Sequence, residues 1–201
     1  MSAILKWHHF GNKTITAPAA IMLHGFMGRG EDWKAVAESI TPSVRCLCPD
    51  LPGHGSQRYD IAGATASIPD IAAALIEYLD DSGIGTCTLI GYSMGGRIAL
   101  YAALHYPHRI TKLVLVSTSP GLRTEQKRTN RLEQDKRLQQ ELAGMGEGSA
   151  EFEAFLRRWY QQPLLSELPK QPLLFEALVQ RRMKNNPPAL SESLHALGVA
   201  S

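Results

Sequence analysis

The pentapeptide Gly91-Tyr92-Ser93-Met94-Gly95 constrains the fold of this 201-residue chain more than any other feature. A short apolar run over residues 86–90 precedes it, and a helical pattern over residues 97–104 follows it. In a strand–turn–helix context, G-x-S-x-G forms a nucleophile elbow, a sharp turn that lifts the serine hydroxyl above the edge of a sheet. The alternative is a chance match in an ordinary βα turn, which the third glycine, Gly96, disfavours. The motif therefore predicts an α/β fold with Ser93 as the candidate catalytic residue.

Short apolar strands alternate with helical patterns through the first 121 residues. An opening pair of strands is expected over residues 2–10 and 13–17. Further strands are expected over residues 19–23, 44–48 and 110–117, and helices over residues 32–40 and from the N-cap Ser67 onward. Such alternation predicts a mostly parallel sheet with helices on both faces.

The composition changes at Gly121. From residue 122 to residue 197 the chain is rich in Arg, Gln, Glu and Leu, and glycines and prolines divide it into short amphipathic stretches. No convincing strand pattern occurs there. We expect two domains, a core over residues 1–121 and a helical lid over residues 122–201, although the pattern alone leaves an ordinary helical tail as the alternative.

Charge and composition exclude several classes of partner. The formal net charge of +2 gives no sign of a nucleic-acid or membrane surface. No apolar run reaches membrane-spanning length, and residues 1–9 lack the charged-then-apolar plan of a signal peptide, so we expect a cytoplasmic protein. Cys46, Cys48 and Cys87 lack metal-ligand spacing and lie in or beside apolar strands, which predicts buried reduced thiols and no metal site.

A reactive serine needs donors for a developing oxyanion and a base that accepts its proton. The backbone N–H groups of Met94 and Phe26 are the candidate donors, because one follows the nucleophile and the other lies after an expected buried strand. His24 and His54 lie in glycine-rich turns and are interpreted as structural, not as the base. His8, His9 and His195 are interpreted as surface or lid residues.

Arg97 lies one helical turn after Ser93 and can share its face of the helix. Because arginine makes bidentate bonds to carboxylates, this position favours a site for an anionic substrate. A salt bridge on the helix surface, for example to a glutamate of the helical region, is the alternative and carries similar weight.

Three motifs resemble the α/β-hydrolase superfamily: Leu23-His24-Gly25-Phe26-Met27-Gly28, Asp50-Leu51-Pro52-Gly53-His54-Gly55 and Gly91-Tyr92-Ser93-Met94-Gly95-Gly96-Arg97. Other segments are more selective. They are Pro120-Gly121-Leu122, the spaced arginines up to Arg131, Trp159-Tyr160-Gln161-Gln162-Pro163 and Arg182-Met183-Lys184-Asn185-Asn186. Together they resemble the 2-succinyl-6-hydroxy-2,4-cyclohexadiene-1-carboxylate synthase family of menaquinone and phylloquinone biosynthesis, over nearly the whole chain.

The resemblance implies a lyase that eliminates pyruvate from a cyclohexene carrying several carboxylates, with no metal or organic cofactor. Ser93 would act as the activated base, and the N–H groups of Phe26 and Met94 would hold the developing charge. The residues that would bind the small anionic substrate are Tyr92, Arg97, Arg131, Trp159 and Arg182. No nucleic acid or membrane partner is implied.

The resemblance also exposes a departure. In this fold the acid and the histidine of the triad follow the lid, whereas this sequence stops at Ser201 in helical sequence, before any counterpart or the last core strands. A sequence truncated at its C-terminus is our first interpretation; completion by another chain and a serine-only pseudoenzyme are the others. We expect the 201 residues alone to be weakly active or inactive.

Two other functions remain open at this point. One is a serine ester or thioester hydrolase, which shares the elbow but takes a different substrate. The other is an inactive pseudoenzyme that uses an arginine-lined pocket to bind an anion.

Overall fold

The structure, a computed structural model, describes residues 5–12, 14, 16–40, 43–55 and 66–198. Within them one five-stranded sheet has the order β1-β3-β2-β4-β5. The strands are β1 (Lys6–Gly11), β2 (Ala19–Leu23), β3 (Arg45–Asp50), β4 (Cys87–Tyr92) and β5 (Ile110–Val116). Only β1 is antiparallel to its neighbour, β3, and the other pairs are parallel. The expected mostly parallel α/β sheet is confirmed.

The prediction of an opening pair of strands is wrong for the second strand, expected over residues 13–17. β1 pairs with β3, in a register that places Lys6 opposite Asp50 and Gly11 opposite Arg45. Residues 14, 16 and 17 lie in no strand, and residues 13 and 15 fall outside the described part of the chain. A turn replaces the strand, because the side-chain Oδ1 of Asn12 accepts a hydrogen bond from the Thr14 N–H at 2.8 Å.

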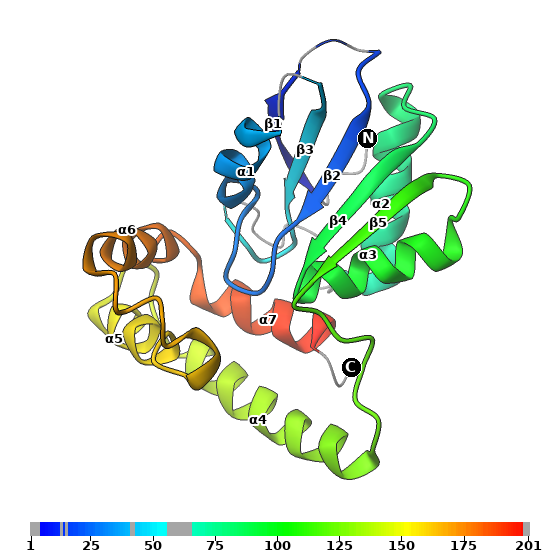
Figure 1. Cartoon of the computed structure of the whole chain (residues 1–201). Coiled ribbons are helices and arrows are strands. Elements are labelled where there is room, and N and C mark those ends of the chain that lie inside the picture. The colour runs from blue at the N-terminus through cyan, green and yellow to red at the C-terminus, as the bar shows by residue number, and fades with distance from the viewer. Residues whose placement is uncertain (1–4, 13, 15, 41–42, 56–65, 199–201) are drawn as a thin grey trace.

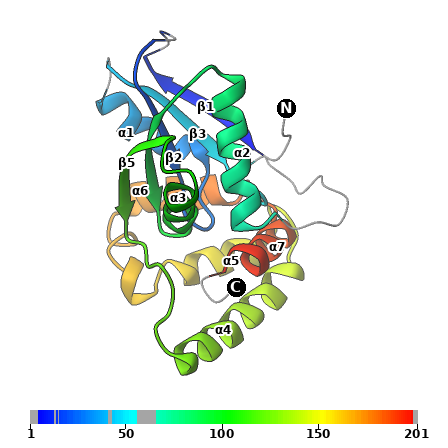
Figure 2. The same cartoon turned by 90° about the vertical axis from the view of Figure 1, so that its right-hand side faces the viewer.

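Helices cover both faces of the sheet, as expected (Figures 1 and 2). On one face lie α2 (Ile68–Asp81) and α3 (Met94–His105), and on the other lie η1 (Gly30–Trp33) and α1 (Lys34–Ser39). The predicted N-cap of α2 is present, because the Ser67 side chain accepts a hydrogen bond from the Asp70 N–H.

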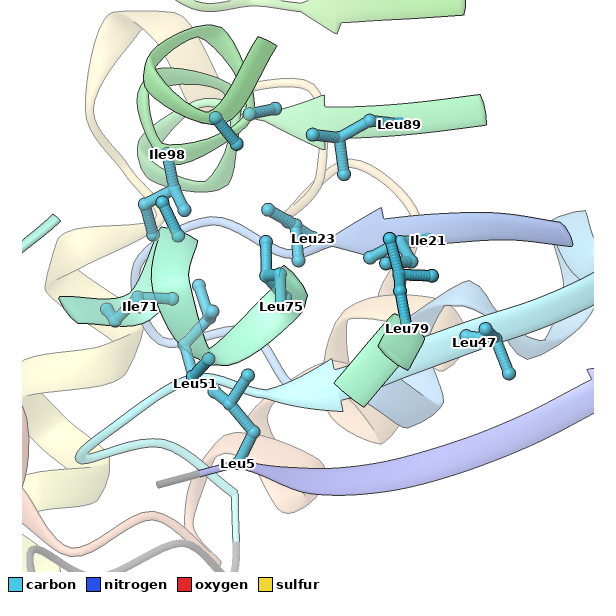
Figure 3. Packing of buried hydrophobic residues seen from close by; sticks show 14 of the residues in the cluster. Leu5, Ile21, Leu23, Leu47, Leu51, Ile71, Leu75, Leu79, Leu89 and Ile98 are labelled. Atoms are coloured by element: carbon cyan, nitrogen blue, oxygen red, sulfur yellow. The ribbon is translucent and has the colours of Figure 1, made fainter. Parts of the chain in front are cut away.

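Alternation along each strand divides the core into two layers. Ile21 and Leu47 pack against the α2 and α3 side, within a cluster that includes Leu75 and Ile98 (Figure 3). Their neighbours in sequence, including Met22, belong to a smaller cluster on the α1 side. Both layers therefore fix the register of the strands that lead to the elbow.

The helical segment, residues 125–197, lies across the carboxyl ends of the parallel strands β2, β3, β4 and β5 (Figure 1). Its elements are α4 (Glu125–Ala143), α5 (Ala150–Trp159), η2 (Pro163–Leu165), α6 (Pro172–Arg182) and α7 (Pro187–Leu197). It has its own apolar cluster, which includes Phe152 and Leu190, yet Leu197 packs into the sheet-side core. The division into a core and a lid stays a prediction.

The three cysteines are buried free thiols, as predicted. Burial raises the pKa of each of them, which keeps the thiols protonated near neutral pH. No described helix combines the length and the apolar character needed to cross a membrane.

Candidate active site

Ser93 lies between β4 and α3 with φ 52° and ψ −113°, the strained conformation expected of an elbow. Such a conformation costs about 1–3 kcal/mol in a non-glycine residue and persists only where the surroundings impose it. Here the Ser93 N–H donates to the Val116 carbonyl at 2.9 Å, and the Ser93 carbonyl accepts from the Thr118 hydroxyl at 2.6 Å. β5 and the residues after it therefore hold the turn in place.

The loop after β2 touches the elbow at backbone distance. The Gly95 N–H donates to the His24 carbonyl at 3.1 Å, and a Cβ at position 95 would lie 2.5 Å from the same oxygen. A Cβ at Gly25 would lie 2.8 Å from the Tyr92 ring and 3.2 Å from the Ser93 Cβ. Glycine at both positions lets the loop approach the serine.

The backbone N–H groups of Phe26 and Met94, both near Ser93, have no hydrogen-bond partner among the described residues. Met94 is the first residue of α3, where helix N–H groups are unsatisfied and the helix dipole favours negative charge. Phe26 lies in a turn closed by a hydrogen bond of 2.9 Å from the Gly28 N–H to the Gly25 carbonyl. Both groups are therefore available to an anion.

A cavity of about 620 Å³ lies above Ser93, within the size range of small-molecule sites. It collects every expected site residue except Arg182. Those lining it are Phe26, Tyr92, Ser93, Met94, Arg97, Arg131 and Trp159. Phe26 comes from the loop after β2 and Tyr92, Ser93 and Met94 from the junction of β4 and α3, whereas Arg131 and Trp159 come from the helical segment.

Arg97 is held by the end of α7. Its guanidinium donates to the carbonyls of Gly198, at 2.9 Å, and of Leu197. The expected alternative, a salt bridge to a glutamate, is wrong, because unsatisfied carbonyls at a helix C-terminus are the acceptors instead. Burial, together with the nearby Arg131, lowers the Arg97 pKa to about 10, so the side chain stays cationic at neutral pH.

Arg131 on α4 reaches the same cavity with its charge partly neutralised. Its Nε donates to Asp135 Oδ1 at 2.7 Å, one helical turn away. The carboxylate is buried, whereas 40% of the Arg131 side chain is exposed. The guanidinium therefore keeps donors that face the cavity.

Arg182 lies in a neighbouring cavity of about 340 Å³ and is not brought to Ser93. Its Nη1 lies 2.7 Å from Asp32 Oδ2, and its Nε donates to the Tyr160 hydroxyl at 3.2 Å. Three aromatic side chains, those of Phe26, Tyr92 and Trp159, line both cavities. The expected grouping of Arg182 with the serine is therefore replaced by two adjoining cavities that share an aromatic partition.

His24 and His54 brace the loops, as expected. His24 Nδ1 lies 2.8 Å from the Gly25 carbonyl, and its Nε2 accepts from the Leu51 N–H at 2.9 Å. His54 Nδ1 lies 3.0 Å from the Pro52 carbonyl. Burial lowers the pKa of His24 to about 4 and that of His54 to about 3, so both rings are neutral near pH 7.

The interpretation of His8 as a surface residue is wrong. Its Nε2 lies 3.1 Å from Oδ1 of Asp50, a fully buried carboxylate that also accepts from the Gly30 N–H at 2.7 Å. Burial opposes ionisation of Asp50, but these two partners outweigh it and lower its pKa. The sequence pattern did not predict this pair, because it did not place β1 beside β3, of which Asp50 is the last residue.

No hydrogen bond within the described residues joins the Ser93 hydroxyl to a histidine or a carboxylate. Both histidines of the sheet-side loops bond to the backbone instead. The described residues therefore supply a serine, backbone N–H groups without partners and cationic side chains at one cavity, and none of their histidines or carboxylates is hydrogen-bonded to the serine hydroxyl.

Comparisons with known proteins agree with this architecture. A putative 2-succinyl-6-hydroxy-2,4-cyclohexadiene-1-carboxylate synthase from Bacillus subtilis (strain 168) is 35% identical over 187 residues, covering 91% of this chain and 65% of that protein. A 2-succinyl-6-hydroxy-2,4-cyclohexadiene-1-carboxylate synthase from Yersinia enterocolitica is 36% identical over 183 residues, covering 90% of this chain and 62% of that protein. This chain therefore spans less than two thirds of the length of these curated relatives.

The solved structure of MenH from S. aureus aligns with a TM-score of 0.85 and 28% identity, covering 96% of this chain and 71% of that one. A family model described as the alpha/beta hydrolase fold matches residues 18–197, which include the elbow, the helical segment and every strand of the sheet except β1. This chain belongs to the alpha/beta hydrolase fold family.

Proposed function

We propose that the protein is a carbon–oxygen lyase that eliminates pyruvate from a polycarboxylate cyclohexene and forms 2-succinyl-6-hydroxy-2,4-cyclohexadiene-1-carboxylate. The observation that carries the proposal is the cavity that unites Ser93 with two free N–H groups and the guanidiniums of Arg97 and Arg131. The names of the Bacillus and Yersinia relatives support the same activity.

Ser93 is the proposed base. Once its own proton passes to an imidazole base, the usual partner of a reactive serine, its oxygen removes a ring proton from the substrate, and the C–H electrons form a ring double bond. The bond between the ring carbon and the enolpyruvyl oxygen then breaks, and its electron pair leaves on that oxygen. Protonation of this enolate gives pyruvate. The N–H groups of Phe26 and Met94 stabilise the negative charge that develops.

The rest of the cavity suits an anionic ring. Arg97 and Arg131 supply charge for carboxylates, and Tyr92, Phe26 and Trp159 supply apolar surface for the carbocycle. Arg182 would join them only for a ligand that extends past the aromatic partition, since Asp32 and Tyr160 hold it in the adjoining cavity.

The test measures pyruvate release from the enolpyruvyl substrate, using the protein as its own cells make it. Removing the base, by Ser93→Ala, is expected to lower kcat by about a thousandfold or more. Ser119→Ala is the matched control, because its exposed hydroxyl bonds only within its own turn, with Gly121, and does not line the cavity. Wild-type turnover in Ser93→Ala would contradict the proposal.

An anion-binding pseudoenzyme is the second candidate, favoured by the lack of a base bonded to Ser93 within the described residues. Its signature is thermal stabilisation by succinate or another dicarboxylate, retained in Ser93→Ala, without pyruvate release. Burst hydrolysis of a p-nitrophenyl ester that does not respond to dicarboxylates would instead indicate an ester hydrolase.

A further inference from the structure

The turn that carries the Phe26 N–H contains a strained residue. Gly25 to Gly28 form a β-turn in which Met27, the third residue, has φ 63°. This position of a turn with positive φ favours glycine or asparagine, because other side chains crowd the backbone there. Contacts from outside the turn must therefore hold it in this conformation.

Those contacts come from the helical segment, far along the chain. The Met27 side chain is fully buried in the apolar cluster of that segment, which includes Phe152 and Leu190. The Met27 carbonyl accepts a hydrogen bond of 3.0 Å from the side-chain Nδ2 of Asn185, which lies between α6 and α7. Figure 1 shows α7 passing beside the loop that follows β2.

Asn185 uses both ends of its amide. Its Oδ1 accepts from the Gly55 N–H at 2.9 Å, while its Nδ2 donates to Met27, and only 2% of the residue is exposed. One buried amide thus joins the helical segment to both glycine-rich loops beneath the cavity. The next residue, Asn186, has a different task, since it caps α7 by accepting from the Ala189 N–H.

We propose that Asn185 is a positioning residue that holds the Gly25–Gly28 turn so that the Phe26 N–H stays directed at the oxyanion beside Ser93. This inference rests on the proposed function. A side-chain donor is required for it, because Met27 offers a carbonyl, and an acceptor is required at the same time, because Gly55 offers an N–H.

Asn185→Asp is the sharpest variant, because it keeps the shape and the acceptor for Gly55 but replaces the donor by a carboxylate oxygen facing the Met27 carbonyl. Asn185→Ala removes both bonds. Asn186→Ala is the matched control, since it removes a helix cap at the adjacent position and leaves both loop bonds intact.

The first readout is amide hydrogen exchange at Gly28, whose N–H closes the turn. We expect at least tenfold faster exchange in Asn185→Asp and Asn185→Ala, and little change in Asn186→Ala. Exchange at Gly28 that equals wild type in Asn185→Asp, or that rises equally in Asn186→Ala, would overturn the inference. This readout needs no turnover, so it remains valid if the proposed function fails.

The second readout is pyruvate release. Because losing a positioned oxyanion donor lowers kcat by about a hundredfold or more, we expect a drop of about tenfold to a hundredfold in kcat for Asn185→Asp, with KM changed less than about threefold. Unchanged kcat in an active protein would overturn the link between Asn185 and the oxyanion. A wild-type protein that releases no pyruvate would instead overturn the proposed function.

Discussion

The two sides of the cavity hold their functional groups in different ways. On the sheet side, residues 24–28 and 91–96 are fixed by main-chain hydrogen bonds and by backbone approaches that only glycine permits. On the helical side, Arg131 and Arg182 are oriented by ion pairs with Asp135 and Asp32. Arg97 connects the two, because it begins on α3 and ends at the carbonyls of α7.

The difference separates chemistry from recognition. Backbone donors are not deleted by changing their own side chains, so a substitution acts on the N–H groups of Phe26 and Met94 only through the contacts that hold their turns, such as that of Asn185 with Met27. Side-chain cations can be moved, neutralised or exchanged, so the helical side sets what the cavity accepts. Substitutions on the sheet side should therefore lower stability more than substitutions on the helical side.

Acid gives the largest expected effect, through the two histidines of the sheet-side loops. Their folded pKa values, about 4 for His24 and about 3 for His54, lie below the ordinary value of 6.5. Below pH 6.5 the two imidazoles therefore bind protons in the unfolded chain but not in the folded chain. Their contribution to the free energy of unfolding is complete only above pH 6.5. We expect the free energy of unfolding to fall by about 5 kcal/mol from pH 6.5 to pH 4.5.

Urea unfolding at a series of pH values measures this slope. His54→Gln should flatten it by about 1.4 kcal/mol per pH unit, because one proton-binding group is lost from the unfolded chain. His105→Gln, at an exposed histidine of α3, serves as the control. A free energy of unfolding that stays constant from pH 7 to pH 4.5 would contradict the burial of both rings.

Glycine-to-alanine substitutions, one on each side of the cavity, give the next largest expected difference in the free energy of unfolding. In Gly95→Ala the new Cβ would lie 2.5 Å from the His24 carbonyl and 2.6 Å from the Leu23 carbonyl, so one backbone must move. We expect a loss of about 3 kcal/mol in the free energy of unfolding, measured by denaturant titration. Gly144→Ala at the end of α4 meets its nearest atom at 3.8 Å and should change stability by less than about 0.5 kcal/mol. Equal losses in the two variants would remove the contrast between the two sides.

Substitution of Arg97 is expected to have the smallest of these effects, and it tests the link that Arg97 makes between α3 and the end of α7. Arg97→Ala leaves the Leu197 and Gly198 carbonyls without their donor, and we expect a loss of about 2 kcal/mol in the free energy of unfolding with faster exchange in the last turn of α7. Arg128→Ala removes a similar bond of 2.8 Å, to the Leu122 carbonyl, at an exposed position and should cost less than about 0.5 kcal/mol. If the two variants lose the same stability, the end of α7 does not depend on Arg97.

Features that depend on neighbours in sequence were predictable. The elbow at Ser93, the N-cap at Ser67 and the contact of His24 Nδ1 with the adjacent Gly25 carbonyl each follow from a few neighbouring residues. Their geometry is imposed by sterics and local hydrogen bonds, which a short pattern encodes.

Features that join distant segments were not predictable. Arg182 was expected beside Ser93, but its partner Asp32 is supplied by η1 on the other side of the aromatic partition. His8 meets Asp50 only because β1 docks antiparallel on β3. Asn185 lay in a motif of the family resemblance, but the motif assigned it no role, since its bonds go to two loops that precede it by more than a hundred residues.

Hydrogen bonds join the helical segment to the rest of the molecule near its two ends, and between them α5 packs against Met27 and Arg182 of α6 pairs with Asp32. Thr118, shortly before α4, bonds to the elbow, while Asn185 and the last turn of α7 are tied to the loops and to Arg97. Between these fastenings, residues 163–171, which comprise η2 and the turn after it, form no described hydrogen bond or ion pair with the sheet side. A protein engineer can therefore exchange this stretch, whose Leu164 and Leu165 line the cavity, to change substrate scope while the reacting centre keeps its geometry.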